Sequence, residues 1–157
     1  ESVVYASEYG FAGDLATGTD ANQADRMFMS AGRTLTTGVS EDIDLYDLNV
    51  LNIGAGAGND PLGQPWIARE IVYLAVVSSS ASTGTLKVGG KGSANAWSAP
   101  FNGDDNAIVL VVPSGFVQFY GASNPAYAVS NTSNHVLKIQ ASGGDCTYDI
   151  VVVARSA

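Results

Sequence analysis

Positive charge is scarce in this chain of 157 residues. Seven lysines and arginines stand against fifteen aspartates and glutamates, which gives a formal net charge of −8 at pH 7. A protein with this charge repels phosphate backbones, so the sequence predicts no nucleic-acid partner. The same repulsion disfavours docking on an anionic membrane. The longest apolar run, residues 71–77, is too short to span a bilayer.

Cysteine and histidine each occur once, as Cys146 and His135. A single cysteine excludes an intrachain disulfide and a cysteine-cluster metal site, and we interpret Cys146 as a small buried residue. Cys146 and His135 could form a nucleophile pair only with a third group that orients the histidine. No Gly-x-Ser-x-Gly elbow is present to supply a serine nucleophile. The glycine-rich stretches 54–58 and 89–93 resemble phosphate-binding loops, but they lack the strand-to-helix context, and we interpret both as turns.

Paired carboxylates are the remaining candidates for chemistry. Asp42 and Asp44 share a face of a predicted strand, and Asp104 and Asp105 lie in a loop rich in Gly and Asn. Two acids are what a glycosidase needs, and oxygen-rich loops also hold Ca²⁺. However, Asp and Asn fill turns for local hydrogen-bonding reasons, and no Asp-x-Asp-x-Asp-Gly loop occurs. We therefore expect no catalytic residue, no metal and no cofactor, and we expect the chain not to be an enzyme.

Alternating apolar residues and turn signals predict strands over most of the chain. The predicted strands are residues 41–46, 68–77, 85–88, 107–112, 116–120, 126–130, 135–141 and 148–154. Eight or nine strands at intervals of roughly ten residues favour an all-β, antiparallel β-sandwich. A jelly roll with two four-stranded sheets is the preferred arrangement.

Two local patterns make these predictions more specific. In residues 41–46 the alternation places Ile43 and Leu45 on one face and the acidic residues on the other. Residues 113–115, Pro-Ser-Gly, predict a tight turn that joins the two flanking strands as a hairpin.

The first forty residues are the least regular. Frequent glycines interrupt them, and residues 20–26 are polar enough for one helical turn with Asp20 as its N-cap. A long irregular segment is unusual inside a compact domain. We therefore predict that residues 1–35 form an extended arm that lies on a neighbouring subunit, and that residues 36–157 form a single jelly-roll domain.

Several aromatic residues lie in or beside predicted loops. Aromatic side chains of this kind occur in cores and at protein interfaces. If Trp66 and Trp97 were instead exposed together on one face, they would form a platform for binding sugars. The sequence leaves these two alternatives open.

The order of several segments resembles a group of tailed-bacteriophage virion proteins that are encoded among head genes. The resemblance spans about residues 20–155 and rests on these segments: Asp-Ala-Asn-Gln-Ala-Asp-Arg at 20–26, Arg-Thr-Leu at 33–35, Glu-Asp-Ile-Asp-Leu at 41–45, Gly-Thr-Leu-Lys-Val-Gly-Gly at 84–90, the loop with Trp97, Val-Pro-Ser-Gly-Phe at 112–116, and Tyr-Asp-Ile-Val-Val-Val at 148–153. Jelly-roll members of such gene clusters serve as capsid decoration, or cement, proteins.

The resemblance implies a protein made in the bacterial cytoplasm and located on the outer surface of the virion capsid. Its partners would be the major capsid protein and further copies of itself, with a homotrimer favoured over a homodimer. We expect capsid or subunit contacts at Tyr9, Phe11, Arg26, Phe28, Arg33, Trp66, Trp97 and Phe101. The alternative function is a carbohydrate-binding jelly-roll module, such as a tail-fibre tip or receptor-binding domain.

Overall fold

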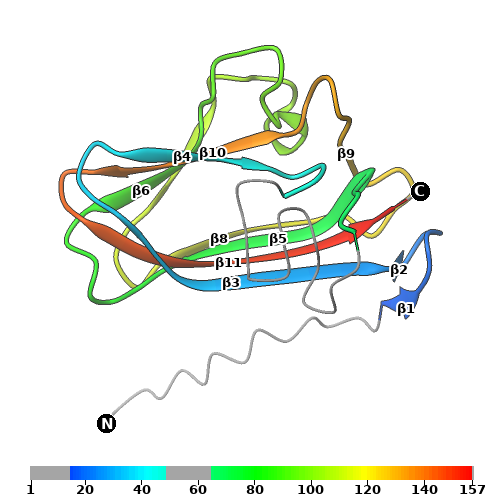
Figure 1. The fold of residues 1–157 in the computed structure, drawn as a ribbon, viewed down its shortest axis with the longest axis horizontal. Coiled ribbons are helices and arrows are strands. Elements are labelled where there is room, and N and C mark those ends of the chain that lie inside the picture. The colour runs from blue at the N-terminus through cyan, green and yellow to red at the C-terminus, as the bar shows by residue number, and fades with distance from the viewer. Residues whose placement is uncertain (1–14, 49–64, 157) are drawn as a thin grey trace, which may run out of the picture.

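A computed structural model describes residues 15–48 and 65–156, which form a sandwich of two facing β-sheets (Figure 1). The four-stranded sheet contains, in spatial order, β4 (Ser40–Asp44), β10 (Val136–Ser142), β6 (Thr85–Gly89) and β7 (Ile108–Val111). The five-stranded sheet contains β3 (Arg26–Leu35), β11 (Cys146–Arg155), β5 (Glu70–Ser78) and β8 (Phe116–Tyr120), and the short β9 (Tyr127–Ala128) also pairs with β5. All these pairings are antiparallel, so the predicted antiparallel β-sandwich is confirmed.

Three small elements complete the described part of the chain. They are the parallel pair β1 (Ala16–Thr17) and β2 (Gln23–Ala24), and one 3-10 turn, η1 (Ala99–Phe101). Residues 20–26 do not form the predicted helical turn. The N–H of Gln23 donates to the carbonyl of Asp20 at 3.1 Å, and Asn22 has a φ of 59°, which a right-handed helix does not allow.

The chain passes from one sheet to the other at most of its connections. β3 leads to β4 in the opposite sheet, β5 returns, and β6 crosses again. β7 stays beside β6, after which β8, β10 and β11 each follow a further crossing. This alternation is compatible with the predicted jelly roll, in which successive strands are shared between two sheets.

The core lies between the sheets and is built from their inward-facing side chains. The strongest predicted strand is β5, whose six consecutive residues 71–76 are all buried, as expected for a strand covered on both faces. Phe28 meets Trp66 edge to face with ring centroids 6.2 Å apart, and Trp97 meets Phe119 in the same way at 5.8 Å. These aromatic contacts tie the loops that carry the two tryptophans to the five-stranded sheet.

The pattern predicted for β4 is confirmed for its apolar residues and wrong for one of its acidic residues. Ile43 and Leu45 are fully buried, as expected. Glu41 has the same parity along the strand, so it also points inward and does not join the other acidic residues. Its carboxylate is hydrogen-bonded to Arg33, with Nε donating at 3.1 Å, and to the hydroxyl of Tyr148. The hydrogen bond to Glu41 raises the pKa of Arg33, and burial raises the pKa of Tyr148.

The predicted hairpin between β7 and β8 is wrong. β7 pairs with β6, whereas β8 pairs with β5, so the two strands belong to different sheets. Residues 113–115 form a corner between the layers, and Ser114, rather than glycine, takes the positive φ of 62°. Val111 is buried in the core and Val117 packs against it, so both strands gain more by facing each other across the core than by pairing edge to edge.

Residues 26–35 are a strand of the sandwich, not part of an arm. β3 pairs with β11 over its whole length, and Phe28 is fully buried. The register shifts midway along this pairing, where Gly32 has a φ of 67° and its N–H donates to the Asp149 carboxylate at 2.7 Å. Before the bulge the even-numbered Phe28 faces inward, and after it the odd-numbered Leu35 does so. This change of parity hides the period-two pattern in the sequence. The rest of the predicted arm includes residues 1–14, which lie outside the described residues.

Replacing Phe28 tests whether β3 belongs to the core. Phe28→Ala should lower the free energy of unfolding by about 3–5 kcal/mol, because it removes a buried aromatic ring. Urea unfolding followed by circular dichroism measures the change. Met27→Ala is the matched control at the exposed neighbouring position, and it should change stability by no more than about 0.5 kcal/mol. If residues 26–35 only rested on the surface, both variants would change the free energy of unfolding by the same small amount.

Candidate functional site

Three of the predicted contact residues are part of the core. Phe28, Trp66 and Trp97 are all at most 2% exposed. The indole N–H of Trp66 donates to the carbonyl of Leu45 at 3.1 Å, which fixes the ring inside the fold. The structure therefore does not contain the exposed pair of Trp66 and Trp97 that a sugar platform would need.

The other predicted contact residues are not gathered at one place. Phe101 is partly buried and packs edge to face on Phe119, with ring centroids 5.4 Å apart. Arg26 pairs with Asp25 at 3.0 Å, and Arg33 turns inward to Glu41. Tyr9 and Phe11 lie outside the described residues.

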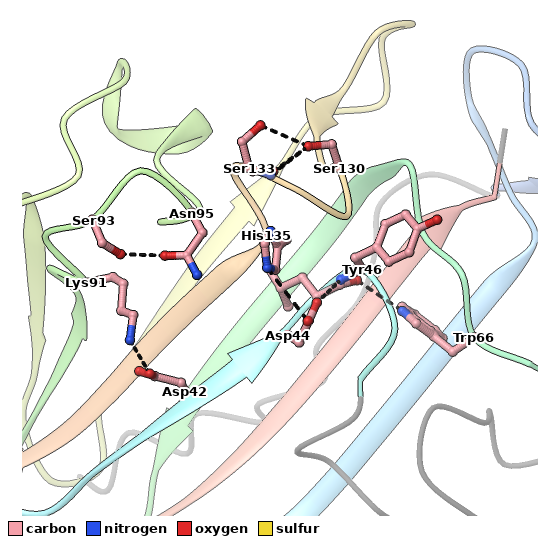
Figure 2. A network of polar contacts seen from close by, with 11 residues as sticks. Asp42, Asp44, Tyr46, Trp66, Lys91, Ser93, Asn95, Ser130, Ser133 and His135 are labelled. Carbon is pink, nitrogen blue, oxygen red and sulfur yellow. Dashed lines mark hydrogen bonds and ion pairs between the residues drawn. The ribbon is translucent and has the colours of Figure 1, made fainter.

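A polar network at one end of the sandwich contains the only histidine of the chain (Figure 2). Asp44 lies 3.8 Å from Nε2 of His135, and its other oxygen accepts the N–H of Tyr46 at 2.9 Å. Burial raises the pKa of Asp44 above its ordinary value. Nδ1 of His135 is buried without a hydrogen-bond partner in the described part of the chain, so no serine is hydrogen-bonded to it there. The pair lacks the nucleophile of a catalytic triad.

Cys146 and His135 lie at opposite ends of β10. His135 immediately precedes β10, whereas Cys146 follows the turn after it and its thiol donates to the carbonyl of Gly144 at 3.8 Å. The seven residues of β10 span about 20 Å at the usual rise of a strand. Cys146 is buried, as predicted, and burial raises the pKa of its thiol. The two residues therefore cannot act as a nucleophile and its base.

The carboxylates serve structural roles. Asp42 and Asp44 do share a face of β4, but Asp42 forms an ion pair with Lys91 (Figure 2). Asp104 accepts the N–H of Asn106 at 2.9 Å, a local turn contact. Among residues 15–48 and 65–156, no group of three or more His, Cys, Asp or Glu side chains could hold a metal ion.

Exposed apolar side chains are the most distinctive surface feature, and they include both methionines of the chain. Met27 and Met29 point outward from β3 and are 60% and 55% exposed, on either side of the buried Phe28. On the same outer face of the five-stranded sheet, each methionine is followed by apolar residues of the paired strands β11 and β5, which gives two apolar rows. The rows are Met27, Val153 and Tyr73, and Met29, Val151 and Ala75. The inner part of the rows is packed against Leu15 and Ala24, while the two methionines at the edge stay accessible.

A second group of exposed apolar residues lies on β7 and β8. Ile108, Leu110 and Val112 point outward from the four-stranded sheet, whereas Phe116 and Tyr120 point outward from the five-stranded sheet, where Tyr120 pairs with Tyr73 and extends the row of Met27. Residues 106–134 contain no Asp, Glu, Lys, Arg or His, so β7 and β8 carry no charged side chain, and the charged residue in register with β7 is Lys87 of β6, beside Leu110. The sequence interpretation missed both groups of exposed apolar residues. The uncharged run of 106–134 is the signal that could have located the second group.

Comparison with known proteins does not assign the chain to a family. No protein-family model matches it, and no curated protein or solved structure matches it significantly. No helix within residues 15–48 and 65–156 has the length and apolar character needed to cross a membrane.

The environment of Asp44 predicts a small pH dependence. Because its folded pKa is raised, the folded protein holds this proton more tightly than the unfolded chain, whose carboxyl titrates near 3.8. The proton therefore contributes stability that is fully present below that value and is lost as the pH rises through the folded pKa. Asp44→Asn removes this contribution. The stability of the wild type relative to the variant should increase as the pH is lowered from about 7 to about 4.

Urea unfolding at a series of pH values measures this difference. The effect should stay below about 1 kcal/mol, because Asp44 is only partly buried and solvent screens its charge. Asp104→Asn is the matched control, since it removes the same charge from an exposed loop. A wild-type advantage that shrinks on acidification would contradict the interpretation of Asp44.

Proposed function

We propose that this chain is a capsid decoration protein of a tailed bacteriophage, which binds the lattice of the major capsid protein and stabilises the mature head. The observation that carries the proposal is the outward face of β3, where both methionines are exposed beside a buried phenylalanine. The proposal also draws on the resemblance of the segment order to phage head proteins. The outer surface of the capsid would be the site of action.

The chemistry of this face suits a protein partner. Burying one methionine completely contributes about 1.5–3 kcal/mol, and the flexible thioether adapts to an irregular surface. Met27 and Met29 stand two residues apart on one edge strand, so a flat partner can cover both at once. The apolar rows behind them, which include Tyr73 and Ala75, hold this edge in a fixed position.

Binding of this kind stabilises the shell through mass action. A protein that binds the assembled lattice but not its separated subunits shifts the equilibrium towards the lattice. Each contact can be weak, because many copies bind one shell. No catalytic step is required for this role.

Carbohydrate binding remains a second candidate because of two exposed aromatic residues on β8. Phe116 and Tyr120 are 55% and 49% exposed. They are four residues apart on the same face of the strand, or about 13 Å, a distance that neighbouring sugar rings could bridge. Under this alternative, Tyr120→Ala should abolish binding to a glycan array while Met27→Gln leaves it unchanged.

The capsid proposal is tested with the double variant Met27→Gln and Met29→Gln. These substitutions keep the length of each side chain but add a polar amide that is costly to bury. Affinity for empty capsids of the phage that encodes the chain should fall by roughly tenfold or more. Co-sedimentation of the purified protein with those capsids over a range of concentrations measures the change.

Val39→Gln serves as the matched control for this experiment. Val39 is also an exposed apolar residue, at 47%, but it lies in the connection between β3 and β4. Its substitution should leave capsid binding unchanged. The proposal fails if the wild type does not sediment with capsids, or if the double methionine variant binds as tightly as the wild type.

A further inference from the structure

β7 is an edge strand with an apolar outer face. It pairs with β6 on one side, and in the described part of the chain no strand pairs with its other side. Ile108 and Leu110 point outward from it and are 46% and 60% exposed, and Val112 directly follows the strand at 59%. An exposed apolar edge strand offers unpaired backbone groups and is a template for pairing with another strand.

The charge distribution indicates which partner suits this edge. The chain carries a net charge of −8, so two copies repel each other over most of their surfaces. Residues 106–134, which include β7 and β8, carry no charged side chain. Two identical acidic chains can therefore pair along β7 without placing carboxylates opposite each other, since the charged residue in register with this strand is Lys87 of β6, beside Leu110. A strongly basic partner would meet no carboxylate on β7 and would lie next to Lys87.

We infer that β7 pairs with β7 of a second copy, antiparallel and about a two-fold axis. The pairing joins the two four-stranded sheets into one continuous sheet across the dimer. Opposite residues of an antiparallel pair point to the same face. An axis at Leu110 places Leu110 opposite its own copy and Ile108 opposite Val112 of the partner. All three exposed side chains then become cross-strand neighbours.

A head-to-tail ring of several copies would bury the edge of β7 in a less favourable contact. It would pair β7 with β4, the other edge of the four-stranded sheet. β4 displays Asp42 and Asp44, which are engaged by Lys91 and His135. Covering these charges with apolar side chains would cost desolvation energy. The symmetrical contact of β7 with itself avoids this cost and is isologous, as in most homodimers.

The first test is the solution mass of the purified chain by light scattering, over a range of concentrations. The inference predicts a dimer. Leu110→Glu replaces the apolar contact at the axis with two facing carboxylates, each beside Lys87 of its own chain, and it should raise the dissociation constant by roughly tenfold or more. Val39→Glu adds the same charge at another exposed position and should leave the dimer intact. A wild-type monomer or trimer overturns the inference, as does a Leu110→Glu variant that still dimerises like the wild type.

The second test does not depend on a charge and fixes the register. In Leu110→Cys the two new thiols would lie opposite each other, with Cα atoms about 4.5–5.5 Å apart, which a disulfide can bridge. Mild oxidation should give a covalent dimer on a non-reducing gel. The wild type, whose Cys146 is buried, and a Val39→Cys variant should stay uncrosslinked. Absence of the Leu110→Cys crosslink overturns the proposed register.

The dimer goes beyond the proposed capsid function and is independent of it. The capsid test changes Met27 and Met29 on β3, whereas the dimer tests change Leu110 on β7. Loss of capsid binding with an intact dimer, or the reverse, separates the two proposals.

Discussion

The pairing of β11 with β3 on one side and with β5 on the other is the interaction on which the rest of the structure depends. β11 is ten residues long, and its inward side chains Tyr148, Ile150, Val152 and Ala154 are all fully buried. Its last residue, Arg155, is also fully buried and donates to the carbonyls of Asp20 and Ser123. The central strand therefore holds the sheet, the segment before β3 and the loop after β8 in one arrangement.

This central pairing also determines what the surface displays. Because β11 fixes the register of β3, Phe28 enters the core and the methionines on either side of it face outward. On the other sheet, β6 fixes β7 in the same way, so that Val111 faces inward while Leu110 faces outward. Both proposed contacts lie on edge strands, whose inner face is used by the core and whose outer face is left for a partner.

Local patterns in the sequence predicted most strands correctly because burial imposes a regular period. β5 and β10 are apolar or alternating runs, and these patterns are typical of buried strands. β3 escaped detection because the bulge at Gly32 reverses the alternation halfway along it. The corner at residues 113–115 was mistaken for a hairpin turn, because Pro, Ser and Gly favour both kinds of turn and only the core decides between them.

The surface was harder to predict than the strands. Trp66 and Trp97 flank loops in the sequence, yet both fill the core, and no local signal separates a buried loop tryptophan from an exposed one. Glu41 was expected outside, but a strand puts every second residue on the same face, and Arg33 and Tyr148 supply the partners that make its inward position acceptable. Tyr148 is 107 residues away from Glu41, and Arg33, eight residues away, reaches it from the opposite sheet, so the pattern within residues 41–46 could not reveal these partners.

The most direct test of this account is amide hydrogen exchange of the purified chain, read by mass spectrometry over residues 26–35. The account predicts that the amides of β3 that donate to β11 exchange slowly in the free protein, as expected for a strand of the sandwich. Exchange of all amides in residues 26–35 at the rate of an unstructured peptide would contradict it. That result would make this segment an arm and would remove the fixed methionine face from which capsid binding is proposed.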